Sequence, residues 1–391
     1  MRSAQRPLRK QPVAPPRRRI WPFLVLAVVI VALPVGWNLL WSYAASIANE
    51  ALAGWISREA ALGRVYSCGS QTTGGFPFGI VMRCDKAAAA FNSNHPPFHL
   101  AASGFTFSAQ LFRPTLLNGD IDGPVTLADP GGPPIFNADW SNARVTLLGL
   151  PPEPERVTIA LAAPRLDRVA GSNGGMIFRA DRLDLDGRII QGSARSNPVI
   201  EASGRFMAAT APSIHPLLAE PLAGEIDAVM RGFKDFSSKP WPALFREMQA
   251  SGGGIEIRLL RLERADAIVV GDGTLSVNAR GKLDGALEVT VAGVENIVPL
   301  LGVDQLIGQG IDRLTGGAGS PAQGLGVLDR LLPGLGGAVR EGANTSLIET
   351  IKKMGKPAQI DNKPAIVLPL RVEDGIIYVG VVPVGILPAL F

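Results

Sequence analysis

The pattern of hydrophobic and polar positions begins with one long apolar block. From Trp21 to Leu40 the sequence contains no charged residue, and about 20 apolar residues are enough for a helix that crosses a bilayer. We therefore predict a transmembrane helix over residues 20–41. A cleaved signal peptide is the alternative, although its apolar segment is usually only about 7–15 residues long.

The residues before this block are basic and include no acid. Residues 1–19 are rich in proline and arginine, which predicts a disordered tail. Positively charged flanks stay on the cytoplasmic side of a membrane. The N-terminus is therefore predicted to be cytoplasmic and the bulk of the chain to be exported. The basic residues are Arg2, Arg6, Arg9, Lys10, Arg17, Arg18 and Arg19.

After the span, the apolar residues keep a helical period over residues 42–63. They recur at steps of three and four residues and so form one stripe on a helix. Gly63 is predicted to end this extension helix, and the stripe is predicted to pack on the first strands. The stripe consists of Trp41, Ala45, Ala48, Leu52 and Trp55.

Residues 64–391 change to a two-residue period, which predicts strands with one apolar and one polar face. Residues 254–293 contain three alternating runs and predict a three-stranded meander. In the first run the phase slips by one residue after Leu259, and only a β-bulge would keep its apolar side chains on one face. We predict a mainly β fold with minor α, built from hairpins as a large curved antiparallel sheet or sheets.

Turn signals support this prediction. Asp-Gly between alternating runs favours a type I′ hairpin turn, because both central residues of that turn need positive φ. A first hairpin is predicted over residues 64–91, with Val65–Cys68 pairing with Gly79–Cys84. The Asp-Gly turns are predicted at 122–123, 186–187, 272–273, 284–285 and 374–375.

Two segments interrupt the strands. Pro240–Ala250 predicts a short helix that caps one end of the sheet, with a possible sub-boundary of the exported domain near residues 237–253. Residues 295–356 predict helices that cover the sheet or act as a flap. Beyond them, alternation resumes up to the apolar C-terminal residues.

The net charge changes the picture only after it is divided along the chain. The formal net charge is +4 and the sequence pI is about 9.2. Without the seven basic residues of the tail, the rest of the chain carries a net charge of −3. The basicity therefore indicates membrane topology, and we predict no nucleic-acid partner.

The two cysteines, Cys68 and Cys84, both lie in the predicted exported part. Disulfides persist in such compartments, so we predict that they form a bond. A loop of about 15 residues closed in this way is stabilised by ~3 kcal/mol in the chain-entropy model. A free catalytic thiol and a metal site are the alternatives, but no histidine lies near both cysteines in the sequence.

Few residues suggest catalysis. The sequence contains no G-x-S-x-G, Walker A or H-E-x-x-H motif. His95 and His99 flank two prolines and Phe98, so they do not share a helical face, and a metal there would need further ligands. His215 precedes a proline and is expected to lie in a loop. Asp181, Asp184 and Asp186 resemble a carboxylate cluster, but a solvated strand face is the favoured interpretation. We assign no catalytic residue, no metal ligand and no cofactor, and expect that the protein is not an enzyme.

Three stretches carry a resemblance to a known family. Gly75-Phe76-Pro77-Phe78 leads to Arg83-Cys84, Gly271–Leu275 is followed by Leu283–Leu287, and Asp374–Gly380 precedes Pro383-Val384-Gly385. From the anchor to the end, the chain resembles the uncharacterised alphaproteobacterial family called domain of unknown function 2125. The β block is distantly similar to the AsmA-like superfamily of anchored envelope proteins, which implies a curved sheet with an apolar trough and a role in lipid transport or envelope homeostasis. Neither resemblance implies catalytic residues.

These observations lead to one favoured hypothesis and two alternatives. The favoured one is a single-pass inner-membrane protein whose periplasmic sheet binds or shields a lipid or other apolar ligand. The predicted partners are inner-membrane lipids at the N-terminal helix, a lipid ligand and an envelope protein. The alternatives are a structural or interaction module of the envelope and a hydrolase. The candidate ligand face consists of Leu275, Val277, Leu287, Val289 and Val291.

Overall fold

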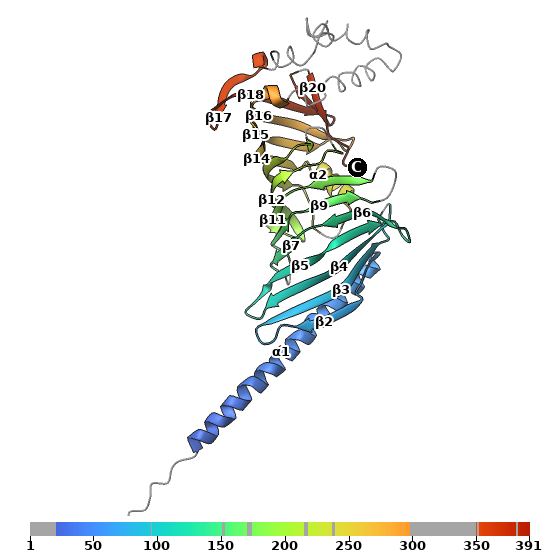
Figure 1. Ribbon diagram of the computed structural model, residues 1–391, viewed down its shortest axis with the longest axis vertical. Helices are drawn as coiled ribbons and strands as arrows, with labels where there is room; N and C mark the ends of the chain where they lie inside the picture. Colours follow the sequence, from blue (N-terminus) through green and yellow to red (C-terminus); the bar gives the residue numbers. More distant parts are fainter. Residues whose placement is uncertain are drawn as a thin grey trace, which may run out of the picture. The chain divides into compact units, whose positions relative to one another are not determined.

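The computed structural model is shown in Figure 1. It divides into two compact units, Met1–Ala53 and Gly54–Phe391. The residues that the structure describes are 21–94, 96–150, 153–169, 174–214, 218–236, 239–297, 349, 352–380 and 382–391.

The described part of the first unit belongs to one long helix, α1 (Trp21–Ala61). Its most apolar 18-residue window has a mean hydropathy of 2.5, so the helix is long and apolar enough to cross a membrane. Pro34 lies inside the helix, where membrane helices tolerate proline because neighbouring groups satisfy the freed backbone. The structure is consistent with a single N-terminal membrane anchor.

The last turns of α1 belong to the second unit. The ring of Trp55 lies 4.8 Å from the ring of Tyr66 between centroids, and Arg64 forms an ion pair with Glu59. The helix ends at Ala61, and Gly63 has a φ of +79°. Glycine adopts this left-handed conformation without a steric penalty, so the predicted end of the helix is confirmed.

Within the described residues, the rest of the second unit is a twenty-stranded antiparallel sheet, which confirms the predicted fold class. The first ten strands are β1 (Arg64–Ser67), β2 (Ser70–Gly74), β3 (Gly79–Phe91), β4 (Phe98–Gln110), β5 (Arg113–Ala128), β6 (Pro134–Asp139), β7 (Asn142–Leu148), β8 (Arg156–Ala162), β9 (Arg165–Arg168) and β10 (Gly175–Arg179). The next ten are β11 (Arg182–Ser193), β12 (Ser196–Ala209), β13 (Leu222–Arg231), β14 (Gly254–Arg264), β15 (Ala267–Val277), β16 (Leu283–Ala292), β17 (Lys356–Ile360), β18 (Lys363–Glu373), β19 (Ile376–Val379) and β20 (Val382–Ile386). The helices α2 (Trp241–Ala250) and α3 (Val294–Ile297) accompany the sheet.

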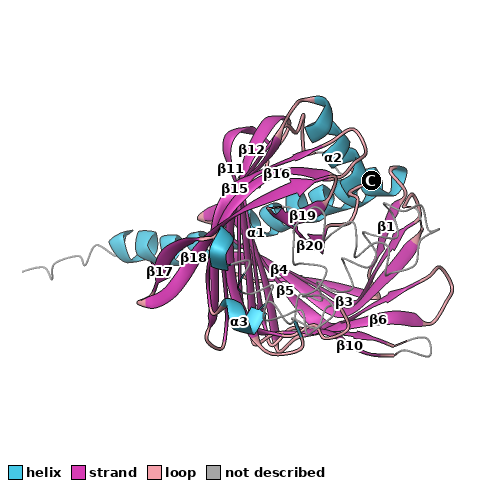
Figure 2. Ribbon diagram, turned by 90° about the horizontal axis from the view of Figure 1, so that it is seen from above, coloured by secondary structure: helices cyan, strands magenta, loops and turns pink. Residues whose placement is uncertain are grey.

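Most strands pair with the next strand along the chain. The main exceptions are the pairings of β5 with β7, β8 with β11 and β16 with β18. Figure 2 shows that the strands curve around a common interior, with α2 on the inner side. The helix predicted at 240–250 is confirmed, and its Leu244 and Met248 pack in one core cluster with Ile200 of β12 and Val277 of β15. We call the sheet face that carries these two strand residues the inner face.

The predicted phase slip in β14 is a β-bulge. The register between β14 and β15 shifts between Ile257 and Leu260. Ile257 lies opposite Gly273 and Leu260 lies opposite Gly271, and residues opposite one another in a ladder share a face. Because 271 and 273 are two residues apart on β15, the bulge keeps both halves of β14 apolar on the inner face.

Four of the five predicted Asp-Gly turns are wrong. Only Asp374-Gly375 forms a hairpin turn, between β18 and β19, with φ values of +54° and +76°. The other four pairs lie within β5, β11, β15 and β16. In β15 and β16, a Cβ at Gly273 would meet the carbonyl oxygen of Ala286, and one at Gly285 would meet that of Thr274. Glycine is needed at these positions because the two strands approach closely. The Asp-Gly dipeptide alone does not show whether glycine serves this approach or a turn.

The first hairpin also differs from its prediction. Residues 64–67 of β1 pair with residues 88–91 of β3, and the hairpin partner of β3 is β2. Strand pairing is interrupted at Cys68-Gly69, so β1 and β2 are two short strands that both pair with the same edge of β3. The predicted disulfide is present: Cys68 at this break is bonded to Cys84 of β3, with 5.7 Å between the Cα atoms.

The Asp374-Gly375 turn is held by a polar cluster. The Asp374 amide donates a hydrogen bond of 2.6 Å to Asp284. The Asp374 carboxylate accepts bonds from Lys282 at 3.2 Å and Asn278 at 3.3 Å, and it forms an ion pair with Arg280 at 2.9 Å. One carboxylate therefore connects the β15–β16 turn to the β18–β19 turn.

We expect Asp374→Asn to lower the melting temperature at neutral pH but not in acid. Burial raises the pKa of Asp374, but hydrogen bonds from Lys282 and Asn278 and the charges of Arg280 and Lys282 outweigh it, so this pKa lies below the ordinary 3.8. A depressed folded-state pKa stabilises the fold above the ordinary value, and this stabilisation disappears as the pH falls through the folded-state pKa. Thermal unfolding of the unchanged chain and of Asp374→Asn, from neutral pH to acid, tests this prediction. A difference in melting temperature that does not change with pH would contradict it.

Candidate apolar ligand-binding site

The inner face is apolar across nearly the whole sheet. One row of directly opposed residues crosses twelve strands from β3 to β18 without a polar side chain. At strand spacings of ~4.8 Å this row is about 50 Å long, longer than the ~30 Å hydrocarbon core of a bilayer. We call it the central apolar row. It consists of Met82, Phe107, Gly119, Val145, Ile159, Leu185, Gly204, Ile226, Leu260, Gly271, Val289 and Leu368.

A second row, two residues closer to α2, repeats the pattern. Its members are all aliphatic side chains, alanine or glycine, so the inner face is a broad apolar surface and not a single stripe. The row consists of Ile80, Ala109, Leu117, Leu147, Val157, Gly187, Ala202, Ala228, Ile257, Gly273, Leu287, Leu370 and Val379.

The five residues predicted from the sequence all lie on this face. Val289 belongs to the central apolar row and Leu287 to the second row, while Leu275, Val277 and Val291 occupy neighbouring rows. Val277, Val289 and Val291 are buried, and Leu275 and Leu287 are partly buried. The helices predicted over most of 295–356 to cover or gate this face lie outside the described residues, apart from α3 and residues 349 and 352–354.

The middle of the inner face retains apolar exposure. Leu185 is 41% exposed and Ile226 is 38% exposed, and both lie in the central apolar row on either side of Gly204. Exposed apolar surface of this kind marks binding sites for ligands, membranes or proteins. The ligand face predicted from the sequence lies on β15 and β16 alone and does not include Leu185 of β11 or Ile226 of β13.

A pocket of about 320 Å³ lies where α2 meets the inner face. Its wall on the sheet side is formed by Val157, Ile189, Ile200, Ala202 and Met230, and its wall on the helix side by Phe233, Phe236, Trp241, Leu244 and Phe245. Its volume is in the range of small-molecule sites. The charged residues Glu155, Arg156 and Arg188 also border the pocket. Because Val157 and Ala202 belong both to the second row and to the pocket, the pocket is continuous with the apolar inner face.

Ion pairs hold the loop that forms this pocket. Lys239 forms ion pairs with Asp235 at 2.9 Å and with Glu247 of α2 at 2.6 Å. The Glu247 carboxylate also accepts a bond of 3.3 Å from the backbone N–H of Lys234. The hydrogen bond from Lys239 is the main cause of a pKa of Glu247 below its ordinary value. The loop before α2 is thus tied to the helix, and both contribute aromatic side chains to one wall.

A family model described as "Uncharacterized protein conserved in bacteria (DUF2125)" matches residues 41–388. The chain belongs to the DUF2125 family. The match covers all the described strands, so the apolar inner face lies entirely within the family's region. No curated protein matches the chain.

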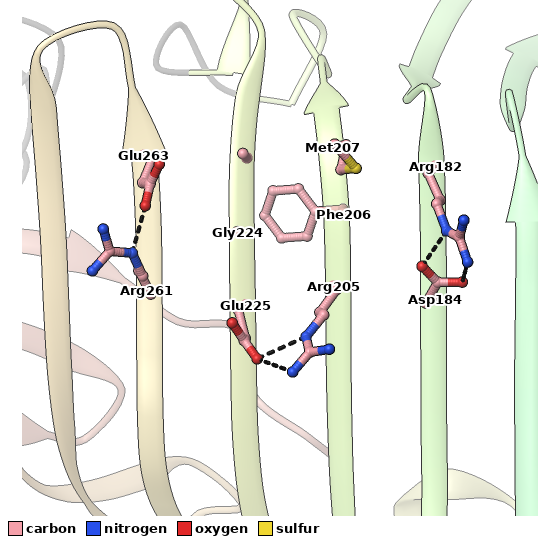
Figure 3. A pocket seen from close by; sticks show the side chains of 10 residues that line it. Arg182, Asp184, Arg205, Phe206, Met207, Gly224, Glu225, Arg261 and Glu263 are labelled. Carbon is pink, nitrogen blue, oxygen red and sulfur yellow. Dashed lines mark hydrogen bonds and ion pairs between the residues drawn. The ribbon is translucent and has the colours of Figure 1, made fainter.

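The outer face of this DUF2125 protein is charged (Figure 3). Asp184, Arg205, Glu225 and Arg261 are directly opposed on β11 to β14 and alternate in charge. They border a hollow of about 360 Å³ that also contains Met207. Ion pairs connect Arg205 with Glu225, Arg182 with Asp184, and Arg261 with both Glu263 and Asp361.

The acidic residues singled out from the sequence lie on or beside this outer face. Asp186 accepts hydrogen bonds of 2.7 Å from Arg156 and Thr158. Burial raises the pKa of Asp186, but these bonds and the charges of Arg156 and Arg188 outweigh it, so the pKa lies below the ordinary value. Asp181 lies in the turn between β10 and β11. A carboxylate held ionised by arginine is a poor proton donor at neutral pH.

The histidines of the DUF2125 chain do not converge on a site. His99 lies in β4 between Ala90 of β3 and Ala128 of β5, and His95 and His215 lie outside the described residues. Within the part of the chain that the structure describes, no group of three or more His, Cys, Asp or Glu side chains is placed to hold a metal ion. The most developed candidate site is therefore the inner face with its pocket.

Proposed function

We propose that this protein binds the acyl chains of membrane lipids on its inner face, as a non-enzymatic, inner-membrane-anchored periplasmic protein of envelope maintenance. The observation that carries the proposal is the central apolar row, which crosses twelve strands and remains partly exposed at Leu185 and Ile226. Each methylene transferred from water to such a surface contributes ~0.8 kcal/mol. Recognition of this kind needs no directional polar group, which fits the composition of the row.

The membrane anchor supports the choice of ligand. The helix α1 is long and apolar enough to span a bilayer, and the basic residues before it favour a cytoplasmic N-terminus. A periplasmic sheet attached to such a helix stays close to a supply of acyl chains. The outer face, with its arginine–carboxylate pairs, is suited to remain in water while the inner face holds the ligand.

Photo-crosslinking of the full-length chain tests the proposal. We expect p-benzoylphenylalanine at Leu185 to crosslink to phospholipid when the protein is expressed in cells and purified in mild detergent. The matched control is the same residue at Met207, which is 58% exposed on the outer face. Mass spectrometry of the products is the measurement.

The products at Leu185 distinguish the alternatives. A crosslink to another envelope protein would support the alternative function, a structural or interaction module of the envelope. Equal lipid crosslinking at Leu185 and Met207 would show only detergent-carried lipid and would contradict a specific inner-face ligand.

A further inference from the structure

Two neighbouring hairpin tips carry exposed phenylalanine rings. Phe76 and Phe78 lie in the β2–β3 turn and are 50% and 65% exposed, and Phe112 lies in the β4–β5 turn and is 74% exposed. The tips are adjacent, because the Leu111 N–H donates a hydrogen bond of 3.0 Å to the Phe78 carbonyl. We call these three rings the aromatic tip.

The two hairpin ends that carry the aromatic tip have little charge of their own. Residues 70–81 contain no charged side chain, and residues 107–119 contain only Arg113, which is exposed. Other turns of the described sheet are more polar, for example Ala265-Asp266 between β14 and β15 and Asp361-Asn362 between β17 and β18. Exposed aromatic rings beside an exposed cation, on two hairpin ends that carry no carboxylate of their own, are a composition suited to the interface of an anionic bilayer.

Chain continuity keeps a bilayer within reach. The apolar span ends at Leu40, and α1 continues without a break into Gly54, where the second unit begins. At 1.5 Å per residue, the helix between these two residues is about 21 Å long. We propose that the aromatic tip inserts into the surface of the membrane that holds α1.

This insertion would place the β3–β5 end of the inner face at the lipid surface. Ile80 of the second row follows the β2–β3 turn directly, and Ala109 pairs with it just before the β4–β5 turn. The proposal does not depend on what the inner face binds, but it adds an entry point to the proposed function. Lipid leaving the bilayer at the tip would meet the second row first.

The test uses the full-length chain in vesicles of phosphatidylethanolamine and phosphatidylglycerol. We expect p-benzoylphenylalanine at Phe78 or at Phe112 to crosslink to vesicle lipid. The same residue at Asn362, in a polar turn, should give no lipid crosslink. As a second measurement, Phe112→Trp should add fluorescence that lipids with brominated acyl chains quench. Crosslinks from the tip to α1 or to another protein alone, or equal lipid crosslinking at Asn362, would overturn the proposal.

One further variant separates this proposal from the proposed function. With aspartate at both Leu185 and Ile226, the lipid crosslink at Phe78 should persist, because the tip contacts the bilayer and not inner-face lipid. Loss of the Phe78 crosslink in this variant would overturn the proposal that the aromatic tip inserts into the membrane. In the chain with the natural residues at 185 and 226 otherwise retained, a lipid crosslink from position 78 without one from position 185 would support insertion of the aromatic tip and contradict lipid binding on the inner face.

Discussion

A chain that carries aspartate in place of both Leu185 and Ile226 is expected to purify without the lipid that the unchanged chain retains. Both side chains belong to the central apolar row and flank Gly204. An acyl chain on this row would bury two carboxylates without partners, at a cost of about 1–3 kcal/mol each. The combined cost predicts at least ~30-fold weaker retention, measured as lipid per protein by mass spectrometry.

The control for this experiment is Met207→Asp. Met207 is exposed on the outer face of β12 and lies opposite Arg182, so aspartate there meets water and a cation. This variant should retain lipid at the unchanged level. Because Leu185 and Ile226 are themselves partly exposed, the double variant should still fold, which thermal unfolding checks. A folded double variant that keeps its lipid would exclude the inner face as the binding site.

Met248→Ala is expected to cause a large loss of stability. Met248 of α2 is fully buried and packs with Ile200, Phe233, Leu244 and Val277. Removing a buried methionine side chain costs about 2–5 kcal/mol, since the cavity is only partly refilled. Denaturant unfolding with fluorescence detection measures the change in the free energy of unfolding.

The same substitution at Met207 is the matched control for α2. Met207 is the exposed methionine of the outer hollow, and exposed truncations usually change stability by less than ~0.5 kcal/mol. The Met248 variant should also enlarge the pocket beside α2, which shares Ile200, Phe233 and Leu244 with this core. An equal change in the free energy of unfolding at both methionines would mean that the packing of α2 does not stabilise the core of the sheet.

The period of the side chains was sufficient to predict the antiparallel sheet and the bulge in β14. When the phase slips between two apolar runs, only a bulge keeps both runs on the same buried face. The positions of Ile257 and Leu260 in the sequence were therefore enough to predict the bulge. The helix at 241–250 followed from its own spacing, but its place on the inner face did not. That place depends on Ile200 and Val277, which are far from α2 in sequence.

The failures have a common physical origin in contacts between strands. Asp-Gly at 284–285 has the same local preference as Asp-Gly at 374–375, yet Gly285 lies against Thr274 of the next strand. The ion pairs of the outer face similarly require the register, since Arg205 and Glu225 are 20 residues apart. For the aromatic tip, residues 75–78 suggested only a family, and their exposure emerged from the fold.

The sequential pairing of the strands gives the sheet a simple route to a different size. A duplicated hairpin inserted between two existing strands would find both neighbours already in place, and no other connection would need to change. Each such insertion would add roughly 10 Å at the ordinary strand spacing. In an architecture of this kind, the length of the apolar inner face follows directly from the number of hairpins in the chain.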